Sequence, residues 1–501
     1  MSIHEGKGWA DSLKDTTLDA VIYLPARGVH AAASMVTVVV LARLIAVAEY
    51  GTFVVLLVWS ALLSACVFNW VTAATFRFYE EARSRGELPR LYRELAFCYL
   101  MMAGVWITVG GAVIGFVLTG FIKVSIAAIL WLVLLGLLEA VVTMYQNVKM
   151  ASRQVQSAAV LTVADSLLRC IFGIAGAVLF DDRVAGVLAG QCVASALVVC
   201  VLAFHVRARI ALGWGRVNRE RVWAFISYGY PMAGMTISSW VLSVSDRLLL
   251  SWMLGASAVG VYSAGYQLGS NSILFPSSSL MAGAFPVLIQ EYERGGQAEA
   301  AQLLTKLVTG VLIVGCALVI FLSIASHPLV KVLPGDPYSS AAAVIPVVAL
   351  GQLLMALSEY FAKSFQLTKQ TSDLFLITLI AACVNVLANL VLVPWIGIMG
   401  AAAATVLAYA VSLGITASHG RKLLAVGLPF GSLWRVVLTS VGTCLVLFWL
   451  QRGLGIAPVI AGLLGLFGVA LFSTTLWATR EPTVVAVASL MFGSQKREVK
   501  D

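Results

Sequence analysis

Charged side chains are scarce in this sequence. Only 11% of its 501 residues are Asp, Glu, Lys or Arg, whereas 60% are hydrophobic. A soluble protein of this length carries roughly a quarter charged residues. The composition therefore excludes an ordinary soluble protein and indicates a membrane protein before any single segment is considered.

Motifs that bind nucleotides or metals are also missing. The sequence has no Walker A loop, no glycine-rich dinucleotide turn and no zinc-ligand spacing. Its eight cysteines lie in or near apolar segments, without a close pair typical of a redox site. The longest loops have about twenty residues, too few for the large extramembrane loop of a membrane glycosyltransferase or polymerase. We therefore expect no enzymatic activity, no catalytic residue, no cofactor and no metal site.

Long apolar runs take the place of the missing charges. A helix needs about twenty mainly apolar residues to cross the hydrocarbon layer. Segments of this kind cover residues 22–44, 50–73, 95–118, 124–146, 158–180, 184–205, 225–251, 258–288, 305–327, 341–362, 373–393, 398–417, 434–451 and 456–478. They predict an all-α membrane protein with about fourteen transmembrane helices.

Lysine and arginine are distributed unevenly among the connecting segments. The polar first twenty residues hold no apolar core of a signal peptide, so we place the amino terminus in the cytoplasm. On that assignment 25 of the 33 basic residues lie in inner loops, tails and span ends, five in outer ones and three inside spans. This asymmetry follows the positive-inside rule. It also explains the net charge of +9 without a nucleic acid partner, because the basic face meets anionic membrane lipids.

An internal repeat relates the two halves of the chain at a spacing of about 210 residues. Three stretches recur in the same order: "LIAVAEYGTF" (44–53) with "MLGASAVGVY" (253–262), "SIAAILWLVLLG" (125–136) with "SAAAVIPVVALG" (340–351), and "VAGVLAGQCVA" (184–194) with "IMGAAAATVLA" (398–408). Gly51 is thereby aligned with Gly260, and Gly186 with Gly400. The repeat predicts two pseudo-symmetric six-helix bundles, a common plan among transporters, plus two extra carboxyl-terminal helices.

The repeat also sets the expected domain boundaries. They are an amino-terminal six-helix bundle over 1–206, a basic cytoplasmic linker over 207–224, a carboxyl-terminal six-helix bundle over 225–418, and two additional transmembrane helices with a cytoplasmic tail over 419–501. Both termini are then expected in the cytoplasm.

A family resemblance appears in three stretches. "ISYGYPMAGMTISSWVLSVSDRLLLSWMLGASAVGVYSAGYQL" (226–268) resembles a signature of bacterial polysaccharide-export flippases, with its Gly-x-Pro opening, an Asp-Arg pair before a leucine run, and Gly-x-Tyr-Ser. "ARLIAVAEYGTF" (42–53) and "VPWIGIMGAAAATVLAY" (393–409) are similar to two further marks of that family. These flippases belong to the multidrug/oligosaccharidyl-lipid/polysaccharide superfamily. The resemblance covers nearly all of the first twelve spans.

The resemblance implies a V-shaped pair of six-helix bundles that works by alternating access in the bacterial inner membrane. It implies a polyprenyl-pyrophosphate-linked oligosaccharide as the substrate, turned from the inner to the outer leaflet for exopolysaccharide or O-antigen synthesis. A polysaccharide polymerase and chain-length machinery are then candidate partners. One departure separates this chain from the multidrug branch, which usually relies on acidic residues in the first bundle, because the first span carries Arg27 and His30 instead.

The charged residues inside the spans are the candidate substrate site. A charge at the bilayer centre costs a few kcal/mol, so such residues face a bundle interior or a wet cavity and are usually paired. In "ADSLLRC" (164–170), Asp165 and Arg169 can pair across one helical turn. The pair could lock the helix, or Arg169 could belong to a cationic wall for the pyrophosphate, since its planar fork suits phosphate.

Arg27 and His30 stand one turn apart in "PARGVH" (25–30), near the inner end of the first span. Pro and Gly beside them indicate a cavity, because only a cavity or neighbouring protein satisfies an interrupted backbone. We expect substrate binding here. Alternatively, Arg27 extends to the inner headgroups, and His30 is either a packed histidine or the carrier of a coupling proton.

Four further charges are candidates for ion coupling or gating. Asp246 and Arg247 lie near the outer end of the seventh span, and adjacent helical residues do not face each other, so we expect separate partners for them. One of them could close an outer gate, or both could make ionic contacts of the fold. Glu139 in the fourth span and Glu359 in the tenth could be protonated, which would suit a proton-coupled cycle.

The eighth span is unusually polar, in "YQLGSNSILFPSSSLMAGAFP" (266–286). Gln267 and Asn271 could bind sugar hydroxyls from a helix kinked at Pro276, or bond to neighbouring helices. In the eleventh span Asn385 and Asn389 are one turn apart, and there we favour helix packing.

Two transport functions compete for this sequence. A flippase for an anionic lipid-linked oligosaccharide agrees with basic residues in the spans. An ion-coupled multidrug antiporter of the same fold would carry cations, which these basic residues would repel. The sequence therefore favours the flippase.

Overall fold

The computed structural model describes residues 5–113, 115, 124–207, 218–427, 430–454 and 458–478. Throughout these ranges the chain is helical, with short turns and no β-strand. Among the described residues, eleven helices are long and apolar enough to cross a membrane, and shorter apolar helices follow at Trp434–Leu447 and Leu464–Ala478. The predicted fold class is confirmed: this is an all-α, multi-pass membrane protein.

By its internal packing the chain forms two units, residues 1–263 and 264–501. The helices of the first unit are α1 (Glu5–Leu44), α2 (Val47–Ser84), α3 (Leu88–Val105), the π-helical turn η1 (Trp106–Gly110), α5 (Ile126–Ala151), α6 (Val155–Leu179), α7 (Arg183–Arg207), α8 (Arg219–Leu254) and the first turns of α9 (Ala256–Arg294). Those of the second are the rest of α9, α10 (Gln297–Val332), the short 3₁₀ turn η2 (Asp336–Tyr338), α11 (Ala341–Leu367), α12 (Thr371–Ile396), α13 (Ile398–Leu423), α14 (Phe430–Leu454) and α15 (Pro458–Ala478).

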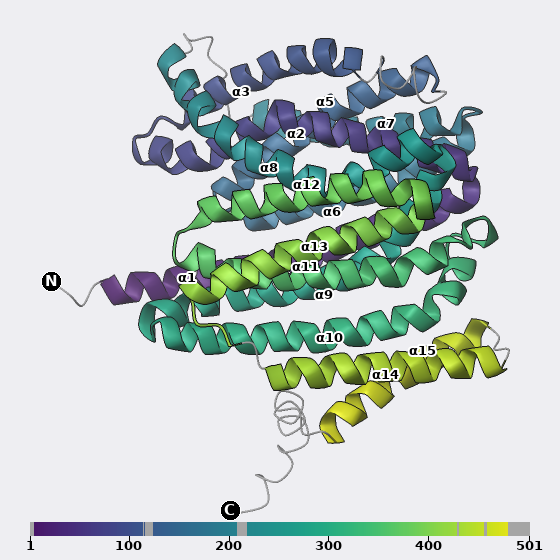
Figure 1. Ribbon diagram of the computed structural model, residues 1–501. Helices are drawn as coiled ribbons and strands as arrows, with labels where there is room; N and C mark the ends of the chain where they lie inside the picture. Colours follow the sequence, from purple (N-terminus) through teal and green to yellow (C-terminus); the bar gives the residue numbers. More distant parts are fainter. Residues whose placement is uncertain are drawn as a thin grey trace, which may run out of the picture. The chain divides into compact units, whose positions relative to one another are not determined.

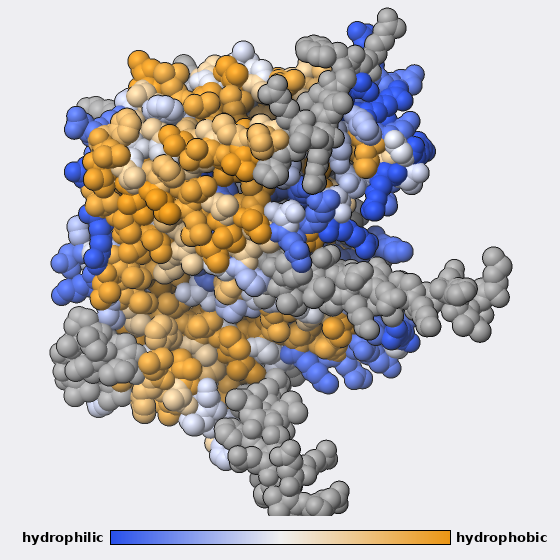
Figure 2. Space-filling view, turned by 180° about the vertical axis from the view of Figure 1, so that it is seen from behind, coloured by the Kyte–Doolittle hydropathy of each residue, from blue (hydrophilic) through white to orange (hydrophobic). Residues whose placement is uncertain are grey.

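Each predicted span is found in one of these helices, where the structure describes it (Figure 1). The helices run past the apolar segments, because polar ends such as the last two turns of α2 continue beyond the hydrocarbon. Figure 2 shows hydrophobic residues along the sides of the helices and hydrophilic residues toward their ends. This pattern is the one expected of helices surrounded by lipid at mid-length.

The first unit is organised around α6 and α7. Helix α7 packs on α5 and α6, while α1 lies along α6 and α2 contacts both α5 and α8. Small residues bring α6 and α7 close together: a Cβ on Gly176 would overlap the carbonyl group of Gly186. Close crossings at small residues are typical of membrane helices. The polar side chains of α6 are thereby held against α1, α5 and α7.

Helix α8 belongs by packing to the first unit. A Cβ on Gly229 would meet the backbone of Trp70 in α2, and the rings of Trp70 and Tyr230 are stacked with centroids 5.6 Å apart. The packing boundary therefore falls after α8, whereas the repeat places the domain boundary before it. The linker expected over 207–224 stays a prediction, because residues 208–217 lie outside the described residues, as does the tail after 478.

In the second unit α11 and α13 form the centre. Helix α11 packs on α10 and α13, and α12 lies against α13. The two extra helices, α14 and α15, pack together along α10 (Figure 1).

The repeat is visible in the backbone of two matched turns. The turn between α5 and α6 and the turn between α11 and α12 each place a basic residue in the left-handed region, Arg153 at φ 57° and Lys369 at φ 61°. Each is followed by a glutamine whose N–H closes the turn: Gln154 bonds to Lys149 O at 2.9 Å, and Gln370 to Phe365 O at 2.8 Å. Two non-glycine residues with this uncommon conformation at matched places support a duplicated six-helix unit.

Candidate functional site: an arginine held by two carboxylates

The polar residues of α6 form a stripe along one side of the helix. Thr162, Asp165, Ser166 and Arg169 recur at spacings of three and four residues, so they share a face. Hydroxyl groups in the stripe are satisfied within the helix, since Ser166 donates to Thr162 O at 2.6 Å. The two charged residues therefore need partners from other helices.

Arg169 is the centre of the cluster. Its Nη2 forms an ion pair with Oε1 of Glu139 from α5, and its Nη1 lies 4.0 Å from Oδ2 of Asp165. Gln191 of α7 accepts a further hydrogen bond from Nη2 at 3.4 Å. The exposed fractions are 24% for the Arg169 side chain, 34% for Glu139 and 16% for Asp165. Arg169 is thus contacted from α5, α6 and α7, and part of its side chain stays exposed.

Helix α1 completes the cluster. Nδ1 of His30 is 2.7 Å from the hydroxyl oxygen of Ser166, which ties α1 to the polar stripe of α6. Arg27 stands one turn before His30 and is exposed. Both Arg27 and Arg169 lie close enough to His30 to act on its charge. The cluster therefore gathers basic groups from α1 and α6 around carboxylates from α5 and α6.

The structure brings together most of the residues predicted for substrate binding. Arg27, His30, Asp165 and Arg169 come from two helices that pack against each other. The Asp165–Arg169 pair is present, but Glu139, which the sequence suggests for ion coupling, is the nearer partner of the guanidinium. The roles assigned to these residues stay predictions.

Two members of the cluster were missed by sequence reasoning, Gln191 and Ser166. The only signal for Gln191 is a polar residue within the apolar stretch of α7. Its place beside Arg169 depends on Gly173, one turn further along α6, where a Cβ would meet the Gln191 side chain at 3.3 Å.

The expectation for Asp246 and Arg247 is wrong in one respect. These neighbours do contact each other, since Arg247 Nη1 lies 3.2 Å from Asp246 Oδ1, although each also has a partner of its own. The long arginine side chain folds back along α8 and also donates to Ser243 O at 3.0 Å. Tyr262 of α9 donates to Asp246 Oδ2 at 2.5 Å, and Arg247 lies 5.9 Å from its ring centroid. The group joins α8 to α9 across the glycine turn at Gly255, whose φ is 84°.

The remaining predicted residues lie in the second unit. Gln267 and Asn271 are half-buried in α9, and Glu359 is exposed on α11. The best-defined polar contacts there join helices of that unit: Gln352 Nε2 donates to the Tyr266 hydroxyl at 2.9 Å, and Tyr360 donates to Ser277 O at 2.8 Å.

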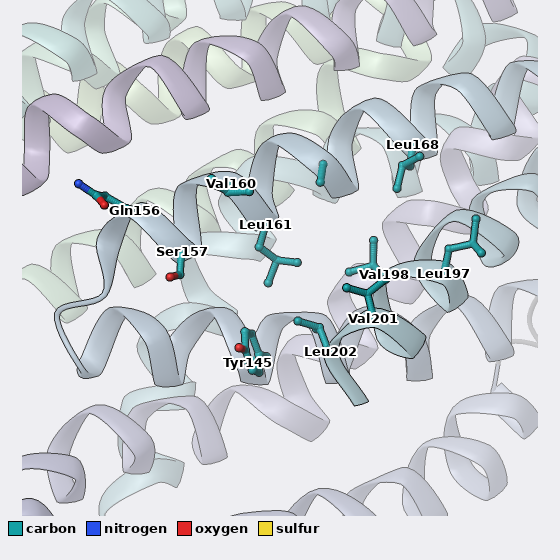
Figure 3. Close-up of a pocket in the computed structure, with 11 residues that line it drawn as sticks. Tyr145, Gln156, Ser157, Val160, Leu161, Leu168, Leu197, Val198, Val201 and Leu202 are labelled. Atoms are coloured by element: carbon teal, nitrogen blue, oxygen red, sulfur yellow. The ribbon is translucent and has the colours of Figure 1, made fainter. Parts of the chain in front are cut away.

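An apolar groove lies on the other side of α6. It has a volume of about 540 Å³ between α5, α6 and α7. Figure 3 shows Leu161, Leu202 and Tyr145 facing this space from three helices. Its wall includes Ala164 and Leu168, the residues next to Asp165 and Arg169 in sequence. One helix thus presents a charged face and an apolar face.

Comparison with known proteins shows which family the chain belongs to. Two family descriptions match the chain: "Polysaccharide biosynthesis protein" over residues 18–292 and "MatE" over residues 231–391. Together they place the fold in the multidrug/oligosaccharidyl-lipid/polysaccharide superfamily, as the resemblance in the sequence indicates. The first match covers more than half of the chain, and the chain belongs to the polysaccharide biosynthesis protein family.

Individual relatives are distant. A Haloferax volcanii protein described as a probable low-salt glycan biosynthesis flippase, Agl15, is 21% identical over 58% of this chain and 62% of its own length. An uncharacterised membrane protein from Methanocaldococcus jannaschii is 25% identical over 38% of each chain. The chain thus spans less than two thirds of the length of either relative.

Solved structures share the fold. The lipid II flippase MurJ in an inward closed conformation matches with a TM-score of 0.69 and 13% identity, over 92% of this chain and 99% of its own. A transporter of the same superfamily from Pyrococcus furiosus, noted for the reverse polarity of its binding pocket, matches with a TM-score of 0.57 and 14% identity, over 82% and 95%.

Proposed function

We propose that this protein is a flippase that moves a polyprenyl-pyrophosphate-linked oligosaccharide from the cytoplasmic to the outer leaflet of the cell's inner membrane. The observation that supports this best is the Arg169 cluster: a partly exposed arginine side chain inside a membrane span, with Arg27 nearby. Intramembrane charges of this kind mark substrate pathways. The fold, and the glycan flippase named among the relatives, support the same substrate class.

The proposed cycle gives each group one task. Arg27 and Arg169 pair with the pyrophosphate, because a guanidinium fork can offer two hydrogen bonds to one phosphate group. His30 fixes the face of α1 toward α6 through Ser166. The polyprenyl tail remains in lipid while the head group crosses, and the two six-helix bundles alternate in exposing the site to either side. A polysaccharide polymerase that consumes the product, together with its chain-length machinery, would draw the cycle outward.

Transport by purified protein tests the proposal. In liposomes that contain a polyprenyl-pyrophosphate-linked oligosaccharide, enzymatic access to the sugar reports its transfer between leaflets. We expect Arg169→Ala and Arg27→Ala to abolish transfer, because each removes a phosphate partner. Arg294→Ala, at an exposed helix end, is the matched control. Wild-type rates for both cluster variants, at equal protein per liposome, would contradict a cationic substrate site.

One observation favours a second candidate. Glu139 and Asp165 outnumber the arginine that they contact, and two carboxylates in a span also suit an antiporter that exchanges protons for a cationic drug. The same liposomes decide between the two candidates. Uptake of a cationic dye driven by a pH gradient, without transfer of the lipid-linked sugar, would favour the antiporter.

A further inference from the structure

Arg169 already has a carboxylate beside each end of its guanidinium. Glu139 contacts one end of the guanidinium, Gln191 shares that end, and Asp165 lies beside the other. A phosphate that binds Nη2 must take the place of Glu139 there, and one that binds Nη1 comes next to the Asp165 carboxylate. Glu139 is the partner of Nη2, and it is the most exposed of the three charged side chains. It is the partner that an incoming anion would meet and displace.

The charges around Arg169 make this displacement depend on protons. Helix α5 contributes Glu139, α6 contributes Asp165, and α1 contributes Arg27 and His30. From α7 come Gln191, which is neutral, and Cys192, whose thiol donates to Trp131 O at 3.1 Å. An anion bound to Arg169 would bring a third negative group next to Glu139 and Asp165, so that all three would repel one another around one guanidinium. A proton on one of them relieves that repulsion.

Asp165 gives a second, independent sign of an incomplete environment. Its Oδ1 atom is buried and accepts no hydrogen bond from the part of the chain that the structure describes. Buried carboxylate oxygens without a donor are rare in folded proteins. Such an oxygen is satisfied when it carries a proton or meets a hydroxyl of a ligand, and both conditions arise when substrate enters the cluster.

We propose that Glu139 and Asp165 are placeholders for the anionic group of the substrate, and that binding at Arg169 is an exchange. The pyrophosphate replaces Glu139 as the partner of the guanidinium, and one of the two carboxylates takes up a proton from hydronium or buffer acid in the surrounding solution to become a carboxylic acid. No other bond forms or breaks, and the proton leaves when the ion pair re-forms. Glu139 thereby sets the affinity of the site for anions. This inference rests on the proposed function, since it requires an anionic substrate.

Calorimetry with farnesyl pyrophosphate, a short polyprenyl pyrophosphate without a sugar, tests the exchange on the full-length protein in detergent. Titrations in two buffers of different ionisation enthalpy count the protons taken up. We expect wild-type protein to take up about one proton more than Glu139→Gln/Asp165→Asn, and to bind more tightly as the pH falls. The pyrophosphate titrates equally in both proteins, so the difference belongs to the carboxylates.

The single variants sharpen the result. Glu139→Gln should bind farnesyl pyrophosphate about tenfold more tightly at neutral pH, because the ligand no longer competes with a carboxylate. Glu293→Gln, at an exposed site in α9, should bind like the wild type. Arg169→Gln should not bind. If Glu139→Gln fails to fold, Asp165→Asn takes its place, and the difference in proton uptake between that variant and the wild type decides.

The outcomes separate the exchange from the proposed function. Wild-type binding that depends on Arg169 but involves no extra proton and no gain in Glu139→Gln would overturn the exchange and leave the flippase intact. Binding that survives Arg169→Gln, or no binding at all, would overturn the placement of the anion in this cluster. Transfer of the lipid-linked oligosaccharide in liposomes measures the flippase separately.

Discussion

Helices α6 and α12 occupy matched places in the two repeats and handle polarity in opposite ways. Midway along α6 the polar residues include Asp165 and Arg169, which remain partly exposed and pair with each other, while Arg169 also pairs with Glu139 of α5. In α12 they are Asn385 and Asn389, both fully buried, with Asn389 Nδ2 bonded to Asn385 O at 2.8 Å and to Asn385 Oδ1 at 3.1 Å. At this depth one helix carries partly exposed charged side chains, and its counterpart carries neutral amides that are fully buried.

The difference shows how a duplicated unit can divide structure from function. Amides that bond within one helix add modest stability and carry no net charge. Carboxylates and a guanidinium in a span have a desolvation cost that a purely structural contact does not need. We therefore infer that the charged α6 stripe is kept for a ligand, and that the α12 pair is kept for packing.

Of the changes that test the contrast between α6 and α12, removal of Arg169 should lower the stability of the protein most. Arg169→Ala leaves two unpaired carboxylates in the span and should lower the unfolding free energy by about 3–5 kcal/mol. The triple variant Arg169→Ala/Glu139→Gln/Asp165→Asn makes α6 neutral, like α12. We expect it to regain most of the thermal stability in detergent without regaining transport. Restored transport in the triple variant would contradict a role of these charged residues in transport.

An intermediate loss of stability is expected at the close helix crossings that both repeats share. A Cβ on Gly186 would collide with the backbone of α6 at Gly176, and a Cβ on Gly400 with the backbone of α12 at Leu392. Gly186→Ala and Gly400→Ala should each destabilise the protein by about 1–3 kcal/mol, because the crossing helices must separate. Gly310→Ala, which has no neighbour within 4 Å, is the control and should be neutral or slightly stabilising. Unequal losses in thermal denaturation would show that the repeats pack differently.

The smallest effect is expected in α12. Asn389→Leu keeps the branched heavy-atom shape and removes the amide bonds to Asn385, so the loss should be about 0.6–1 kcal/mol. Transport in liposomes should stay near the wild-type rate. A transport defect without loss of stability would place the asparagine pair in the substrate path. It would contradict the inference that α12, unlike α6, uses its polar residues for packing.

The helical segments were predictable because the hydrophobic period and length of a span are local properties of the sequence. The repeat and the family resemblance also follow from sequence, since both are carried by short stretches such as those around Gly186 and Gly400. The i,i+4 spacing predicted the Asp165–Arg169 pair, which is present at 4.0 Å. The same helical rule failed for Asp246 and Arg247, because a long side chain can fold back to its neighbour.

By itself, then, the sequence determined a helical, multi-pass, duplicated membrane protein with charges placed inside its spans. Only the tertiary structure decided that Glu139 of α5 and Gln191 of α7 surround Arg169, and that His30 of α1 joins them through Ser166. The reason is physical. Which face a helix turns toward its neighbours depends on close crossings such as Gly176 with Gly186, and these join residues that no local pattern relates.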